Sequence, residues 1–182
     1  MNALIIYWSA TGNTKLVAET IHNALKNGGV NSTLKCVEEA KDEDLCEYGL
    51  VFIGAPSYGW QAPAPVQEYI KEKMGYYRKR GNIKLCAPKL PDKKAVVFVT
   101  YYGPHTGINE AIPVGKYLGQ FFEHLGFDLA GEWYTIGEFH NSEDNSTKGR
   151  LGDIRGRPNQ QDLDNIARDV NELLKTIDGL QT

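Results

Sequence analysis

Residues 5–21 read IIYWSATGNTKLVAETI, and they contain three structural signals in direct succession. The apolar run Ala3–Trp8 is short and rich in β-branched and aromatic residues, which indicates a buried strand. Small and polar residues fill Ser9–Thr14, and from Leu16 onward apolar residues recur at helical spacing. The stretch therefore predicts a strand, a tight loop and a helix that follow one another directly.

The loop has the composition of an anion-binding site. A helix N-terminus leaves backbone N–H groups unpaired and carries about half a positive charge, so a phosphate can be bound there. Ser9, Thr11 and Thr14 add hydroxyl groups, Asn13 adds an amide, and Gly12 lets the backbone approach a ligand closely. The predicted phosphate site comprises Ser9, Ala10, Thr11, Gly12, Asn13 and Thr14. The alternative is an ordinary N-terminal cap of Ser, Thr and Asn.

Common nucleotide loops are missing from this position. Neither GxxxxGK[ST] nor GxGxxG follows the first apolar run, which disfavours ATP, GTP and a Rossmann-bound NAD.

Four further apolar runs alternate with helical patterns along the rest of the chain. The predicted strands are Ala3–Trp8, Ser32–Val37, Leu50–Gly54, Ala95–Tyr101 and Leu129–Gly137. The third and fourth runs are almost wholly apolar, as expected for parallel strands buried on both faces. We expect an α/β fold with a doubly wound, five-stranded parallel sheet in the order 2-1-3-4-5. Residues 1–182 show no linker or internal repeat, which favours a single domain.

Composition excludes several classes of protein. The net charge of −3 gives no electrostatic reason to expect a nucleic-acid partner. No apolar stretch approaches the ~18 residues of a membrane span, and the N-terminal sequence does not have the pattern of a signal peptide, which favours the cytoplasm by default. Cys36, Cys46 and Cys86 are odd in number and have no CxxC spacing, so disulfides and zinc sites are not expected. No His, Asp and Glu set has metal-ligand spacing, and no catalytic triad is recognisable.

Residues 5–21 resemble the phosphate-binding signature of the flavodoxin family. The match includes the aliphatic pair Ile5-Ile6, Tyr7, Ser9, Gly12, Thr14, Ala18 and Ile21 at the family's spacing. The resemblance implies a flavodoxin-like fold and one non-covalently bound FMN.

The loops after the third and fourth predicted strands then become candidates for binding the flavin ring, because ligands of such sheets lie beyond the carboxyl ends of the strands. By resemblance, Tyr58 or Trp60 would cover one face of the ring and Tyr101 or Tyr102 the other. Gly59 falls where the family places a backbone carbonyl near flavin N5. The predicted ring site comprises Pro56, Ser57, Tyr58, Gly59, Trp60, Thr100, Tyr101, Tyr102, Gly103, Thr106 and Gly107.

Two functions are the main candidates for a chain with these features. The first is an electron-transfer protein that shuttles electrons between redox protein partners through FMN. The second is an FMN-dependent NAD(P)H or quinone oxidoreductase, which could use Arg78-Lys79-Arg80, or Arg150, Arg155 and Arg157, to hold a phosphate. A third reading is a binder that retains the phosphate loop for another ligand. No catalytic residue is assigned.

Two long segments exceed a minimal five-strand unit. Gly75–Lys94 is basic, and Glu138–Asn159 is polar and rich in glycine. The second follows the last strand, so we expect it on the rim that carries the ligand loops, beside the flavin site or against a partner. His105 could lie near the ring or a substrate.

Overall fold

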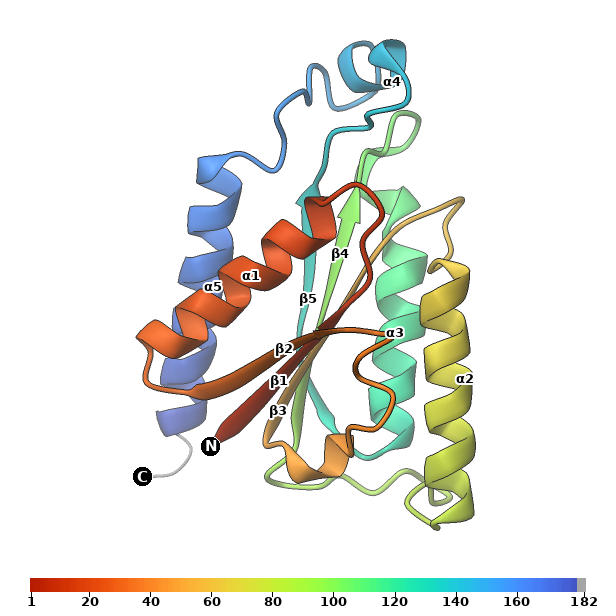
Figure 1. Cartoon of the computed structure of the whole chain (residues 1–182), viewed down its shortest axis with the longest axis vertical. Helices are drawn as coiled ribbons and strands as arrows, with labels where there is room; N and C mark the ends of the chain where they lie inside the picture. Colours follow the sequence, from red (N-terminus) through yellow and green to blue (C-terminus); the bar gives the residue numbers. More distant parts are fainter. Residues whose placement is uncertain (180–182) are drawn as a thin grey trace.

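The structure, a computed structural model that describes residues 1–179, contains a parallel sheet in the order β2-β1-β3-β4-β5 (Figure 1). The strands are β1 (Asn2–Tyr7), β2 (Asn31–Cys36), β3 (Leu50–Pro56), β4 (Lys94–Tyr101) and β5 (Asp128–Ile136). Every neighbouring pair runs parallel. The predicted fold class and strand order are confirmed, and each strand end lies within two residues of its predicted position.

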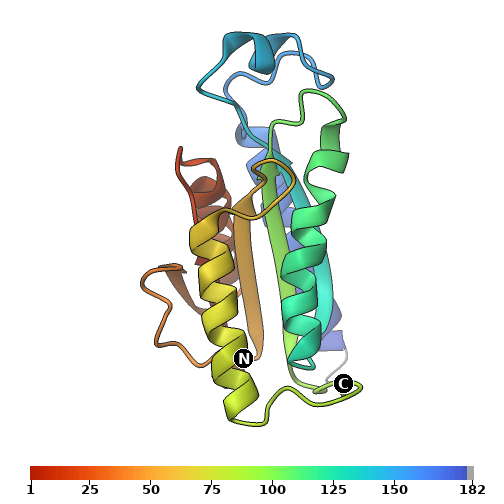
Figure 2. The ribbon, with the colours of Figure 1, turned by 90° about the vertical axis from the view of Figure 1, so that its right-hand side faces the viewer.

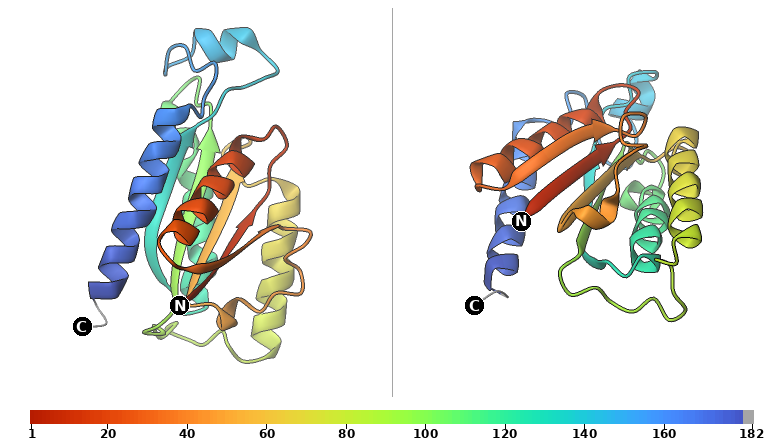
Figure 3. Two further views of the ribbon diagram at one scale, coloured as in Figure 1. Left: turned by 60° about the vertical axis from the view of Figure 1, so that its left-hand side comes forward. Right: turned by 60° about the horizontal axis from the view of Figure 1, so that its bottom comes forward.

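Helices cover both faces of the sheet, and a further short helix, α4 (Glu143–Thr147), lies beyond the carboxyl ends of the strands. The covering helices are α1 (Asn13–Asn27), α2 (Ala64–Lys79), α3 (Ile112–His124) and α5 (Gln160–Gly179), with 3₁₀ turns η1 (Leu45–Glu47) and η2 (Gly107–Glu110). α1 and α5 pack on one face, and α2 and α3 pack on the other (Figures 2 and 3). This two-sided cover is what makes the central strands apolar on both faces.

Alternation along β1 shows how the two cores form. Leu4 and Ile6 belong to the core beneath α2 and α3, whereas Ala3 and Ile5 belong to the core beneath α1 and α5. All four side chains are buried, because successive residues of a strand point to opposite faces and both faces are covered. The rigid sheet holds the loops at its carboxyl end in a fixed arrangement.

The two long segments lie at opposite ends of the sheet. The first five residues of Gly75–Lys94 form the end of α2. The guanidinium of Arg80 lies 3.6 Å from the carboxylate of Asp44, which is beside η1 and the start of β3. Glu138–Asn159 contains α4 and lies beyond the carboxyl ends of the strands, at the top of Figure 1. The rim position expected for the second segment is therefore observed.

Candidate functional site

The carboxyl ends of β1, β3 and β4 open into a cavity of about 380 Å³. This volume falls within the usual range for small-molecule sites. Predicted site residues that line it are Ser9, Ala10, Thr11, Asn13, Thr14, Pro56, Ser57, Tyr58, Gly59, Thr100, Tyr101 and Tyr102. Predicted residues outside its lining are Gly12, Trp60, Gly103, Thr106 and Gly107. The structure thus brings residues of the predicted phosphate site and of the predicted ring site together around one cavity.

The loop after β1 keeps the start of α1 open. Gly12 occupies the N-cap position with φ of +100°, a conformation that glycine adopts without a Cβ penalty. Among the described residues, no side chain caps α1, and its first turn carries no acidic group. Since the first amides of a helix have no intrahelical acceptor, they remain available to an anion.

Two of the predicted phosphate donors have protein partners. The Thr14 and Thr100 hydroxyl groups lie 2.7 Å apart in a buried hydrogen bond, which ties the loop to β4. The Asn13 side-chain amide donates to the Glu138 carbonyl at 2.9 Å, which ties the loop to the segment after β5. These residues therefore fix the loop, in addition to any ligand contact.

The loop after β3 separates its two aromatic residues. Tyr58 and Gln61 exchange backbone hydrogen bonds of 3.0 and 3.1 Å, and the two residues between them have positive φ, 54° at Gly59 and 65° at Trp60. Tyr58 faces the cavity and meets the Trp8 ring edge-on, with ring centroids 6.0 Å apart. Trp60 is 64% exposed and lines a separate, smaller hollow with Tyr117. Tyr58 is thus the cavity-facing aromatic of this loop.

The loop after β4 turns away from the cavity after Tyr102. Gly107 N–H donates to the Gly103 carbonyl at 3.1 Å, and a Cβ on Gly103 would lie 2.6 Å from the Gly107 carbonyl oxygen. Thr106 and the backbone N–H of His105 bind the Glu110 carboxylate. The glycines and Thr106 therefore shape the loop, while Tyr101 and Tyr102 supply its cavity wall.

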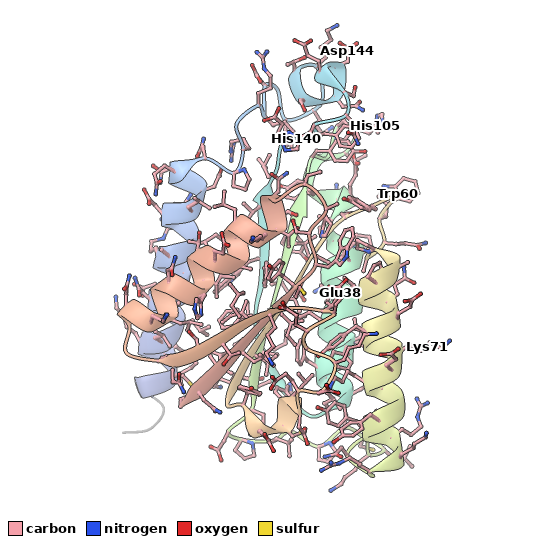
Figure 4. All side chains as sticks on the ribbon, in the orientation of Figure 1. Glu38, Trp60, Lys71, His105, His140 and Asp144 are labelled. Carbon is pink, nitrogen blue, oxygen red and sulfur yellow. The ribbon has the colours of Figure 1, made fainter. Side chains whose placement is uncertain are left out.

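Sequence reasoning missed one wall of the cavity. Gly137, Glu138, Phe139, His140 and Asn141 line it directly after β5. Their place at the start of the long polar segment was the available signal, since that segment follows a strand whose carboxyl end lies at the same rim. Figure 4 shows His140 and His105 at this end of the molecule, near α4.

The cavity wall carries little charge. Glu138 is the acidic residue among the described lining residues, and its carboxylate lies 3.8 Å from His140 Nδ1. Burial raises the pKa of the Tyr58 and Tyr101 hydroxyl groups above their ordinary value, so both stay protonated at neutral pH.

Within residues 1–179 we find no cluster of three or more His, Cys, Asp and Glu side chains suited to a metal ion. In the same range, no helix is long and apolar enough to span a membrane.

The chain is similar in sequence to known flavodoxins. The family described as flavodoxin domain matches residues 4–112. The flavodoxin of Megasphaera elsdenii is 27% identical over 99 residues, which cover 53% of this chain and 63% of that protein. The match thus spans less than two thirds of that relative's length.

Solved structures agree with the fold. Oxidised flavodoxin 1 from Bacillus cereus superposes with a TM-score of 0.67 at 14% identity, over 96% of this chain and 98% of that one. The flavodiiron core Flv1 from Synechocystis sp. PCC6803 gives a TM-score of 0.63 at 19% identity, over 99% of this chain but 36% of that one. Since the family match covers more than half of its residues, this chain belongs to the flavodoxin domain family.

Proposed function

We propose that this chain is a single domain that binds FMN non-covalently and carries electrons between redox protein partners. Flavodoxin-family proteins bind FMN. The observation that carries the proposal is the cavity in which the open start of α1 and the tyrosine-bearing loops after β3 and β4 converge. When bound there, FMN supplies the redox chemistry, and the protein binds and tunes it.

The residues present fit the phosphate end of FMN. The free amides at the start of α1 favour an anion, and Ser9 and Thr11 stand beside them in the cavity lining. Ser9 Oγ already accepts from Gly12 N–H at 3.1 Å, so its own proton is free to point toward a phosphate oxygen. The loop contains no Lys or Arg, so we propose that neutral donors hold the phosphate.

The other end of the cavity fits a flat aromatic ring. Tyr58 and Tyr102 contribute aromatic surface from loops after adjacent strands, and Gly59 contributes backbone polar groups beside them. Flat rings in proteins favour offset stacking or edge-on contacts with such side chains. We propose that these two tyrosines lie against the isoalloxazine ring.

Charge placement favours a carrier over an NAD(P)H-dependent enzyme. Arg78-Lys79-Arg80 lies at the opposite end of the sheet from the cavity. Arg155 is paired with Asp153, and Arg157 with Asp162. The side chain of Arg150 forms no ion pair among the described residues, but neither it nor the other two arginines line the cavity. The cytoplasmic location stays a prediction.

Titration of the flavin-free protein with FMN and with riboflavin tests the proposal. We expect FMN to bind at least about tenfold more tightly, because riboflavin lacks the phosphate that the start of α1 would hold. Absence of FMN binding by correctly folded protein would refute the proposed function. Steady-state oxidation of NADH or NADPH, with and without a quinone, then separates the two readings: a carrier gives no sustained turnover alone, whereas an oxidoreductase does.

A further inference from the structure

Two aromatic rings from distant segments form a stack in the cavity wall. Tyr102 follows β4 and Phe139 follows β5, and their ring centroids are 4.3 Å apart with planes inclined by 15°. Both side chains line the cavity. Since Phe139 covers one face of Tyr102, a flat ligand stacking on Tyr102 can use only its other face.

Phe139 is held from behind by a buried serine. Ser146 Oγ, on α4, accepts from the Phe139 N–H at 3.1 Å and donates to the Phe139 carbonyl at 3.0 Å. Ser146 is 1% exposed, and its own carbonyl accepts from the N–H of Ile154, which is equally buried. The backbone of Phe139 is therefore satisfied and immobilised by the segment around α4.

The same segment also holds the loop that carries Tyr102. Arg150 N–H donates to the Pro104 carbonyl at 2.8 Å, and Leu151 lies against Gly107 and packs on the core. Together with the Asn13 contact to Glu138, the segment is fastened to the loops at both ends of the cavity. Its polar sequence thus encodes a scaffold for the site.

We propose that Phe139, fixed by Ser146, is a positioning residue that holds the Tyr102 ring in the orientation that stacks on FMN. This rests on the proposed function, because it concerns how the same cavity receives the flavin. The Tyr102 side chain alone could turn about its own bonds. A parallel ring on one face restricts that rotation before the ligand arrives, which lowers the entropic cost of binding.

A double-mutant cycle with Phe139→Leu and Tyr102→Leu tests the proposal through two readouts, the FMN dissociation constant and the fluorescence of bound FMN. We expect Phe139→Leu to weaken FMN binding by about three- to tenfold, since the energy of an aromatic pair corresponds to this range. The fluorescence of bound FMN should rise, because a less well-oriented Tyr102 ring quenches it less. Phe139→Tyr should restore both values, and Ser146→Ala should shift both in the same direction as Phe139→Leu. The double variant should bind no more weakly than Tyr102→Leu, because the effect of Phe139 passes through Tyr102.

Tyr117→Leu is the matched control, since Tyr117 is an aromatic residue of the smaller hollow. It should leave both readouts unchanged, and thermal unfolding should show that each variant is folded. Wild-type affinity and quenching in Phe139→Leu, or additive losses in the double variant, would overturn the inference alone. Failure of the wild-type protein to bind FMN would overturn the proposed function and this inference with it.

Discussion

The hydroxyl groups of Thr14 and Thr100 lie 2.7 Å apart, and both side chains are almost completely buried. Thr14 is in the first turn of α1, and Thr100 is near the end of β4. The bond joins the proposed phosphate end of the cavity to the strand that carries the proposed ring loop. One internal contact therefore couples the two ends of the site.

This bond predicts a non-additive pair of substitutions. Thr14→Val and Thr100→Val should each destabilise the flavin-free protein by about 1–3 kcal/mol, because each leaves the partner hydroxyl buried without a partner. The double variant should regain most of that loss, since it leaves no orphaned hydroxyl. Urea unfolding of the four proteins measures this, and simple addition of the two losses would contradict it.

The two aromatic residues of the loop after β3 should behave differently. Tyr58→Leu should weaken FMN binding by about three- to tenfold, because Tyr58 lines the cavity. Trp60→Gly should change the affinity by less than about twofold, and it should not lower stability, since glycine suits the positive φ at this position. Parallel titrations and thermal unfolding decide the matter, and a marked loss of FMN affinity in Trp60→Gly would place the ring elsewhere.

Glu138 predicts a charge effect on the flavin. Its carboxylate belongs to the cavity wall and accepts from Gly156 N–H at 2.7 Å, a bond that a glutamine oxygen can also accept. Glu138→Gln should tighten FMN binding by a few-fold and make the reduction potential of bound FMN less negative, because it removes a negative charge from the wall of the proposed FMN cavity. Calorimetry and spectroelectrochemistry measure the two effects. The exposed Glu143→Gln is the control, and equal behaviour of the two variants would refute a specific role.

The sheet could be predicted from sequence because its signal is local. The runs that became β1, β3 and β4 are apolar on both faces, and the loop after β1 carries its own helix start. The loop that runs directly into a helix could likewise be predicted from residues 9–14 and their neighbours. These features depend on neighbours in the chain, and the structure reproduces them.

Contacts between distant segments could not be predicted in the same way. The partner of the Asn13 amide is 125 residues away, at Glu138, and nothing near Asn13 indicates it. Phe139 likewise meets Tyr102 only once β4 and β5 are paired. Tyr58 and Trp60 line different hollows because of the positive φ values at Gly59 and Trp60, which the sequence of this loop does not reveal.

Glu43 should make the fold sensitive to acid, away from the cavity. Its carboxylate binds the Lys35 ammonium and accepts from the Tyr48 hydroxyl at 2.5 Å, and the Lys35 hydrogen bond is the main reason that its pKa lies below 4.5. A carboxyl group whose pKa is lower in the folded than in the unfolded protein stabilises the fold at pH values above the unfolded pKa. This stabilisation is lost as the pH falls below about 4.5 and through the pKa of Glu43 in the folded protein. Urea midpoints measured from pH 7 to pH 3 should therefore fall less steeply in Glu43→Gln than in the wild type. Asp42→Asn, at an exposed neighbouring position, should keep the wild-type slope. Parallel curves for wild type and Glu43→Gln would show that the ion pair contributes nothing to acid stability.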